Sequence, residues 1–311
     1  MVKISVCMIV RNEQAVLARC LDCVKHFADE LIIVDTGSSD KTKEIAGQYT
    51  DYVYDFLWVD DFAAARNYSY SFATGDYIMW VDADDVIDKN NADKINRLKT
   101  SLTTDIVMVY MLYDIPENGG CSMRQRLVSR SCNPVWVGAL HEVIPLQGNY
   151  LDTDIVFHHQ KIEDKNAEQK LKILTSLVSN LDAMDFRLKS HCWLDLHRRH
   201  KTQEAELVYR HCLREIKASP SVDIASCLLI GSVLQNAQEY QNAINWYEMA
   251  TEMLHSTQQD RVSKELFQVF QQLVKCYCAI GNKDGARHYN ELAGQLSPNS
   301  QSVKVNAILL K

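Results

Sequence analysis

The chain has 311 residues, of which 47% are hydrophobic and 23% are charged, a composition typical of soluble globular proteins. The length predicts two domains, and the net charge of −7 argues against a nucleic-acid partner and against a polybasic membrane contact. No stretch approaches the roughly 20 apolar residues of a membrane span, and Arg11 and Glu13 come too early for a signal peptide. The ten cysteines are scattered through apolar segments, so we expect reduced thiols in a cytoplasmic protein.

Up to about residue 160, short apolar runs alternate with helical patterns. Strands are predicted over residues 4–10, 31–34, 51–54, 77–81 and 106–112, and helices over 13–27, 41–49 and 63–73. This alternation predicts an α/β domain with a mostly parallel sheet covered on both faces, a Rossmann-like arrangement. Ligands of such sheets bind beyond the carboxyl ends of the strands. Because the polar segments that begin at Arg11, Asp35 and Asp82 all follow strands, we expect them to meet in one crevice.

From about residue 165 onward the pattern is entirely helical. Ala205, Ala243 and Ala286 each precede an aromatic residue by three or four positions within a predicted helix. The pattern resembles degenerate tetratricopeptide (TPR) repeats, whose ideal period is about 34 residues, and an irregular helical bundle is the alternative. We therefore predict an α/β domain over 1–162 and an all-α domain over 163–311. Such a helical surface is suited to a peptide or protein partner, and a homodimer through it remains open.

The Asp82-Ala83-Asp84 motif, at the end of an apolar strand, is the most informative feature of the chain. Two carboxylates on a loop that leaves a buried strand suit a divalent cation bridged to a diphosphate. Asp-x-Asp alone is common on solvated turns, but here Asp85 adds a third negative charge. Like charges crowded in this way are costly unless a cation or an anion-binding partner offsets them. The motif therefore predicts a metal and diphosphate site.

Polar residues at the other strand ends are candidates for ligand contacts. Asp35 follows a buried strand, where its carboxylate could accept a hydrogen bond from a nucleobase N–H or a ribose hydroxyl. Arg11 and Asn12 either contact the ligand or close their own loop. Arg66 and Asn67 supply a cation and an amide on a helix, and a surface salt bridge is the alternative for Arg66.

Together, these motifs resemble the nucleotide-sugar-binding half of family 2 glycosyltransferases with the A-type (GT-A) fold. The matching stretches are residues 5–13, 33–40, 65–67 and 80–84, in the order of the family. The resemblance implies inverting transfer of a hexose or N-acetylhexosamine from a UDP-sugar, with Mg²⁺ or Mn²⁺ acting as a Lewis acid on the leaving diphosphate. It implies that the donor contacts come from Val10, Arg11, Asn12, Glu13, Asp35, Gly37, Arg66, Asn67, Asp82, Ala83, Arg126 and Trp136.

The same resemblance implies a metal site at Asp84. Residues 154–159 read as a strand, on which His158 and His159 face opposite sides. One of the two is expected to be an ordinary packing or surface histidine. The family resemblance favours His158 as the second metal ligand beside Asp84.

Glu142 is the candidate general base, because an inverting displacement needs a group that takes the acceptor proton. A structural pairing with Arg124 or Arg126 is the alternative for this carboxylate. Asp85 is the rival base, since it sits beside the metal motif. Many relatives carry the base on a later Glu-Asp pair followed by an Arg-Trp motif, and this chain lacks that pattern.

A transferase domain followed by helical repeats resembles bacterial protein and peptide glycosyltransferases. This resemblance implies an acceptor at a Ser, Thr or Cys side chain. A cell-surface glycan or a lipid-linked acceptor is one alternative. The other is an inactive scaffold that binds a sugar nucleotide and recruits partners through its repeats. A sugar nucleotidyltransferase is disfavoured, because residues 10–13 lack the Gly-rich loop that it needs.

Overall fold

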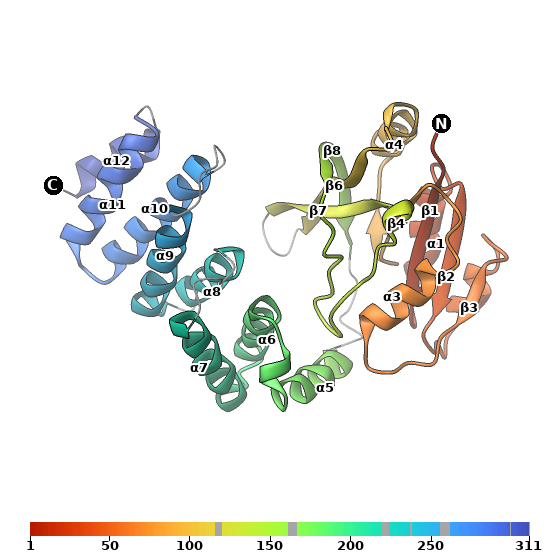
Figure 1. Ribbon diagram of the computed structural model, residues 1–311, viewed down its shortest axis with the longest axis horizontal. Helices are drawn as coiled ribbons and strands as arrows, with labels where there is room; N and C mark the ends of the chain where they lie inside the picture. The colour runs from red at the N-terminus through yellow and green to blue at the C-terminus, as the bar shows by residue number, and fades with distance from the viewer. Residues whose placement is uncertain are drawn as a thin grey trace. The chain divides into compact units, whose positions relative to one another are not determined.

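The computed structural model describes residues 1–115, 120–160, 167–218, 224–236, 238–255, 262–298 and 300–310. The chain divides into two compact units, Met1–Ile173 and Leu174–Lys311 (Figure 1). The first combines strands with helices and the second is helical throughout its described residues, so the predicted fold classes are confirmed. The predicted boundary between residues 162 and 163 lies outside the described residues.

One eight-stranded sheet is the framework of the first unit. Its strands are β1 (Ile4–Val10), β2 (Glu30–Asp35), β3 (Val53–Asp55), β4 (Tyr77–Trp80), β5 (Asp85–Val86), β6 (Ile106–Ile115), β7 (Gly120–Ser129) and β8 (Asn149–His159). They are ordered β3-β2-β1-β4-β7-β6-β8-β5. Pairing is parallel from β3 to β4, antiparallel on both sides of β7, parallel between β6 and β8, and antiparallel between β8 and β5. The sheet is thus mostly parallel, as predicted, and mixed beyond β4.

Apolar side chains fill both faces of this sheet. Its helices are α1 (Leu17–Val24), α2 (Thr42–Ala46), α3 (Phe62–Tyr70) and α4 (Lys89–Ser101). Met8 of β1 belongs to the core beneath α1 and α4, whereas its neighbour Cys7 belongs to the core beneath α3. Side chains alternate between the faces of a strand, so a strand buried on both faces must be apolar at nearly every position. This explains the continuous apolar run of β1.

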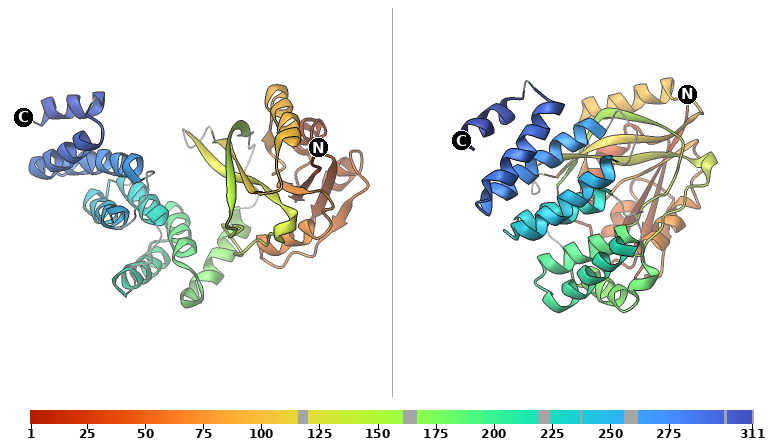
Figure 2. Two further views of the ribbon diagram at one scale, coloured as in Figure 1. Left: turned by 45° about the horizontal axis from the view of Figure 1, so that its top comes forward. Right: turned by 60° about the vertical axis from the view of Figure 1, so that its left-hand side comes forward.

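The second unit consists of paired helices. After α5 (Ala167–Val178) come α6 (Phe186–Arg198), α7 (Thr202–Ala218), α8 (Ile224–Asn236), α9 (Tyr240–His255), α10 (Val262–Ala279), α11 (Lys283–Leu296) and α12 (Gln301–Leu309). Consecutive helices pack as α6 with α7, α8 with α9, and α10 with α11 (Figure 2). A Cβ on Gly231 would lie 2.8 Å from the ring of Tyr247, so this glycine allows α8 and α9 to approach closely. The predicted helical repeat is confirmed.

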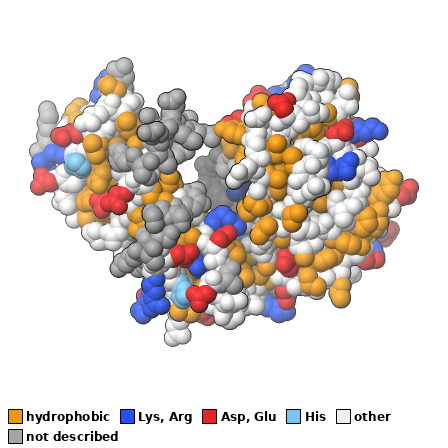
Figure 3. All heavy atoms as spheres, viewed as in Figure 1, with side chains coloured by type: hydrophobic (Ala, Val, Ile, Leu, Met, Phe, Trp, Pro, Cys, Tyr) orange, Lys and Arg blue, Asp and Glu red, His pale blue; other side chains and the backbone are white. Residues whose placement is uncertain are grey.

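The surface of the described residues mixes charges of both signs. On the face drawn in Figure 3, acidic and basic side chains lie interspersed among apolar ones rather than in one field. None of the described helices is both long and apolar enough to span a bilayer. The cysteines whose side chains are described carry free thiols, as the sequence predicts.

Candidate functional site

Asp35, the last residue of β2, is a buried carboxylate with one satisfied oxygen. It is only 2% exposed, and Oδ2 accepts hydrogen bonds from the backbone N–H groups of Gly37 (3.0 Å) and Ser38 (2.9 Å). The φ of Gly37 is +101°, a left-handed conformation that favours glycine in this turn. Oδ1 is buried and has no hydrogen-bond partner in the described part of the chain. An orphaned buried acceptor is costly, so this oxygen fits an N–H or O–H donor of a ligand.

The loop after β1 is tied to the loop after β2. Asn12 has a φ of +55°, its Oδ1 accepts from the backbone N–H of Ser39 (2.8 Å), and its own N–H donates to Ser38 Oγ (2.9 Å). The N–H of Glu13 donates to Thr42 Oγ1 (2.7 Å). Asn12 therefore closes this loop, the structural alternative given for it above, and Glu13, expected only as a donor contact, helps to close it through its backbone. Arg11 lies half-buried beside them. Val10 and Ala83 are core residues whose side chains are buried.

Arg66 of α3 links two carboxylates. Its Nε donates to Glu142 Oε1 (2.7 Å) and its Nη2 donates to Asp82 Oδ1 (3.0 Å). Its Cζ lies 5.1 Å from the Trp80 ring and 5.0 Å from the Trp136 ring. Burial opposes its charge, but the two carboxylates outweigh this effect and raise the pKa of Arg66. Glu142 thus pairs with an arginine, as its structural alternative required, but the partner is Arg66 rather than Arg124 or Arg126.

Asn67 holds the segment that carries Trp136. Its Nδ2 donates to the carbonyl of Trp136 (2.9 Å), and its Oδ1 accepts from the N–H of Trp136 (2.8 Å). Trp136 is 7% exposed and packs edge-to-face on Tyr70 and Trp80. Both the nitrogen and the oxygen of the Asn67 side-chain amide are therefore hydrogen-bonded to the backbone of Trp136.

Asp85 and Arg126 form a fully buried ion pair beneath the Asp82-Ala83-Asp84 motif. Arg126 Nη1 is 2.8 Å from Asp85 Oδ2, and neither side chain has any exposed area. The Arg126 guanidinium packs against the rings of Trp80 (3.8 Å), Tyr113 (4.4 Å) and Phe157 (4.7 Å). Burial alone would raise the pKa of Asp85, but Arg126 and further hydrogen bonds hold it below its usual range. The structure does not bring Arg126 to the surface of the crevice, where the sequence analysis had placed it.

Asp84, Asp85 and His159 form a group whose donor atoms lie within 4.8 Å of one another. His159 Nδ1 is 3.4 Å from Asp84 Oδ1. Hydrogen bonds that the His159 imidazole donates to the carboxylates of Asp84 and Asp85 raise the pKa of His159 to about 10. Burial raises the pKa of the neighbouring Asp82. Carboxylate oxygens and an imidazole suit Mn²⁺ or Mg²⁺, and a cation would relieve the crowding of like charges. The donor set therefore fits a divalent cation.

His159, rather than His158, is the histidine that meets this group. The short strand β5 places Asp85 opposite His159 and Val86 opposite His158. His158 instead pairs with Asp114, with Nδ1 2.9 Å from Oδ2. The two histidines do alternate along β8, but the expectation that His158 joins Asp84 differs from the structure. The strand β5, which sets this register, is not among the strands that the sequence predicts.

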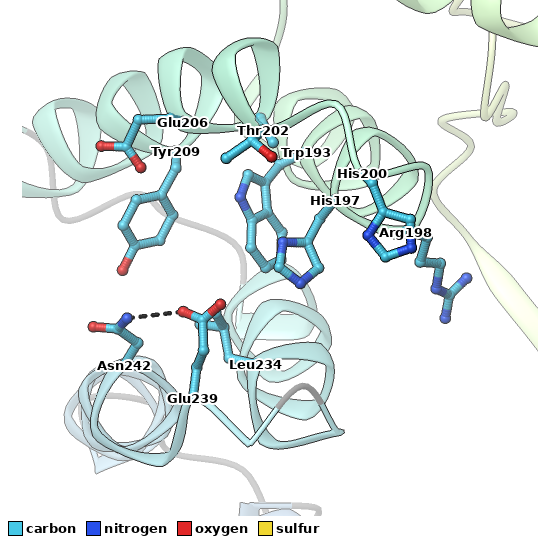
Figure 4. Close-up of a pocket in the computed structure, with 11 residues that line it drawn as sticks. Trp193, His197, Arg198, His200, Thr202, Glu206, Tyr209, Leu234, Glu239 and Asn242 are labelled. Atoms are coloured by element: carbon cyan, nitrogen blue, oxygen red, sulfur yellow. Dashed lines mark hydrogen bonds between the residues drawn. The ribbon is translucent and has the colours of Figure 1, made fainter.

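The second unit contains a cleft of about 330 Å³ between two helix pairs (Figure 4). Trp193 of α6 stacks on His197 and packs against Tyr209 of α7. Glu206 lies at one end, and Glu239 accepts a hydrogen bond from Asn242 Nδ2 (3.0 Å) on the facing side. Its volume falls within the range of small-ligand sites, which run from about 300 to 1,000 Å³. The cleft thus offers aromatic rings and carboxylates to a ligand.

Acidic residues beyond the strand ends of an α/β sheet place the first unit among proteins that bind ligands at that edge. The sequence model of glycosyl transferase family 2 matches residues 5–163, just over half of the chain. The chain belongs to this family.

Known relatives each match a part of the chain. A TPR repeat-containing protein of Synechococcus elongatus is 49% identical over 85 residues, which cover 27% of this chain and 21% of that protein. An uncharacterized glycosyltransferase of Rickettsia felis is 33% identical over 112 residues, 36% of this chain and 39% of the relative. The chain thus spans less than half the length of these relatives. The crystal structure of glucosyl-3-phosphoglycerate synthase from Mycobacterium tuberculosis in complex with Mg²⁺ and UDP aligns with a TM-score of 0.42 and 17% identity, over 59% of this chain and 81% of that one.

Proposed function

We propose that the chain is a metal-dependent, inverting glycosyltransferase that transfers a hexose or N-acetylhexosamine from a UDP-sugar. The observation that carries this proposal is the meeting of Asp84 and His159, two donors suited to a divalent cation, in a family 2 chain. Asp35 supports it, because its orphaned buried Oδ1 can accept the N–H of a uracil. We favour an active enzyme over an inactive scaffold, since the chain has both Asp35, whose Oδ1 can accept from the nucleoside, and Asp84 with His159, which can bind a metal.

Each residue has a distinct task in this proposal. Asp35 accepts from the nucleoside, while Arg66 stays charged between Asp82 and Glu142 and fixes both carboxylates. Asp84 and His159 would hold Mg²⁺ or Mn²⁺, which would neutralise charge on the leaving diphosphate. The acceptor oxygen or sulfur bonds to the anomeric carbon as the bond from that carbon to the diphosphate breaks. The acceptor proton passes to a carboxylate, and UDP leaves.

Glu142 is the carboxylate that we assign to this proton. Its side chain keeps 13% exposure, and its Oε1 is held by Arg66, which leaves Oε2 to face an acceptor. Asp85 is a poorer base, because it is fully buried and both of its oxygens accept hydrogen bonds.

The variant Glu142→Gln is expected to lower kcat by about 10² to 10⁴ for a hydroxyl acceptor, the usual contribution of a general base. Glutamine can still accept from Arg66, so calorimetry should find UDP binding unchanged. A thiol acceptor should lose less, because its pKa of about 8.5 lies nearer neutrality. An unchanged kcat with a hydroxyl acceptor would exclude Glu142 as the base.

We further propose that the acceptor is a polypeptide side chain held through the helical unit. The cleft supports this, because aromatic rings beside Glu206 and Glu239 suit a Lys or Arg side chain of a peptide. Intact-mass spectrometry of candidate proteins incubated with a panel of UDP-sugars tests the acceptor class directly. A mass increment on a protein confirms it, while transfer only to a glycan or lipid-linked oligosaccharide favours that alternative.

The double variant Glu206→Gln and Glu239→Gln is expected to lower kcat/KM for a basic peptide acceptor about tenfold, or roughly 1.4 kcal/mol. Hydrolysis of the UDP-sugar without acceptor should stay unchanged, because the cleft lies in the helical unit. Glu291→Gln, an exposed glutamate of α11, is the matched control. Equal kcat/KM in the double variant and this control would rule out the cleft as an acceptor site.

A further inference from the structure

Tyr113 of β6 has a hydroxyl that lies between Asp85 and His159. Its oxygen is 2.8 Å from Asp85 Oδ1 and 2.8 Å from His159 Nδ1. The residue is 7% exposed, and its ring centroid lies 5.6 Å from that of His159. The proposed reaction makes no use of this hydroxyl, although it hydrogen-bonds two of the three residues of the metal-binding group, Asp85 and His159.

The proton of the Tyr113 hydroxyl can point in only one direction. Asp85 Oδ2 accepts from Arg126 Nη1 (2.8 Å) and from the N–H of Asp82 (3.1 Å), so Asp85 is a carboxylate salt-bridged to a guanidinium. An ionised carboxylate only accepts hydrogen bonds, and a tyrosine hydroxyl has a single proton. Tyr113 therefore donates to Asp85 Oδ1. Its oxygen must then accept from His159, so Nδ1 of His159 carries a proton.

Asp85 has no oxygen left for a cation. Oδ1 is taken by Tyr113, Oδ2 is taken by Arg126 and the backbone of Asp82, and the side chain has no exposed area. Of the group of three, only Asp84 and His159 keep partly exposed side chains, 20% and 19% respectively. The cluster thus consists of two partly exposed candidate metal ligands, Asp84 and His159, and one buried carboxylate, Asp85.

We propose that Tyr113 and Asp85 are positioning residues that keep a proton on His159 Nδ1, which leaves Nε2 as the nitrogen that can bind the cation. Metal-bound histidines commonly donate their other N–H to a carboxylate, which fixes the tautomer and the ring orientation. Here a tyrosine hydroxyl stands between the imidazole and the carboxylate. This inference rests on the metal site of the proposed function.

The test compares two tyrosine-to-phenylalanine variants of the full chain. Tyr113→Phe removes the bridging hydroxyl and keeps the ring. Tyr77→Phe is the matched control, since it removes another hydroxyl that donates to backbone carbonyls, those of Ile106 (2.6 Å) and Thr103 (3.0 Å). Mn²⁺ binding in the presence of UDP, followed by electron paramagnetic resonance of the free ion, should weaken about 10- to 100-fold in Tyr113→Phe and stay unchanged in the control.

Nitrogen-15 NMR of the histidine rings supplies a second readout. In the wild-type Mg²⁺·UDP complex, His159 should show the Nδ1–H tautomer, and the signal is assigned by its loss in His159→Gln. An Nε2–H tautomer there, or unchanged Mn²⁺ affinity in Tyr113→Phe, would overturn the inference. If the wild type binds no Mn²⁺, the proposed function fails instead. The tautomer of His159 in the wild-type Mg²⁺·UDP complex still tests the position of the proton if Tyr113→Phe does not fold.

Discussion

Replacing Asp84 by Asn should lower metal-dependent glycosyl transfer about a thousandfold, which corresponds to roughly 4 kcal/mol of transition-state stabilisation. Asp84 is the carboxylate of this cluster that combines a partly exposed side chain with a position beside His159. Asparagine keeps the shape of the side chain but loses its charge, so the fold should be retained. Initial rates measured across a Mn²⁺ titration, with circular dichroism of the variant, provide the measurement.

The adjacent histidines provide a matched pair for the same assay. His159→Gln should reproduce most of the loss, whereas His158→Gln should not, because His158 pairs with Asp114 away from the cluster. Activity in Asp84→Asn equal to wild type would reject the metal site altogether. Loss in His158→Gln but not in His159→Gln would instead favour the ligand expected from family resemblance.

Replacing Arg126 by Met should destabilise the α/β unit by about 3–5 kcal/mol, the usual cost of leaving one partner of a buried ion pair without its counter-charge. Asp85 would remain buried without the guanidinium, although Tyr113 and the backbone N–H of Asp82 would still donate to it. Three aromatic rings would also lose their contact with the guanidinium. Hydrogen exchange of the β6 and β7 amides, combined with urea denaturation, measures the loss in this unit.

Arg124→Met is the control for this stability measurement. Arg124 lies on the same strand, two residues away, with an exposed side chain. Its replacement should change the free energy of unfolding by no more than about 0.5 kcal/mol. Adding Asp85→Asn to Arg126→Met should recover part of the lost stability, because the buried charge disappears. A variant Arg126→Met as stable as the control would show that Asp85 is not held by this pair.

The positions of the strand-end carboxylates could be predicted from sequence, because strand ends are local signals. The apolar runs before Asp35 and Asp82 locate two carboxyl ends of a parallel sheet, and both residues lie there in the structure. The helix pairs of the second unit also follow from local spacing. Ala205, Ala243 and Ala286 are all buried within α7, α9 and α11.

Features that depend on the pairing of distant strands could not be predicted from the sequence. Arg126 resembles a ligand contact in sequence, but pairing of β7 between β4 and β6 turns it into the core. The choice between His158 and His159 depends on two residues of β5, too short to show a period. Helix α4 was missed because only a narrow apolar stripe, Ala92, Ile95 and Leu98, reaches the core from an otherwise polar sequence.

The segment that carries Glu142 is closed at both ends. Val137 and Val143 exchange backbone hydrogen bonds of 2.9 and 3.1 Å, and Asn67 clamps the adjacent Trp136. The five residues in between form a closed loop that is held further by the buried side chain of Leu140 and by the N–H of Phe62, which donates to the carbonyl of Ala139 (2.9 Å). For enzyme engineering, the proposed role of Glu142 makes this closed loop the place to seek a new acceptor preference, provided that Leu140 stays buried and Glu142 stays on Arg66.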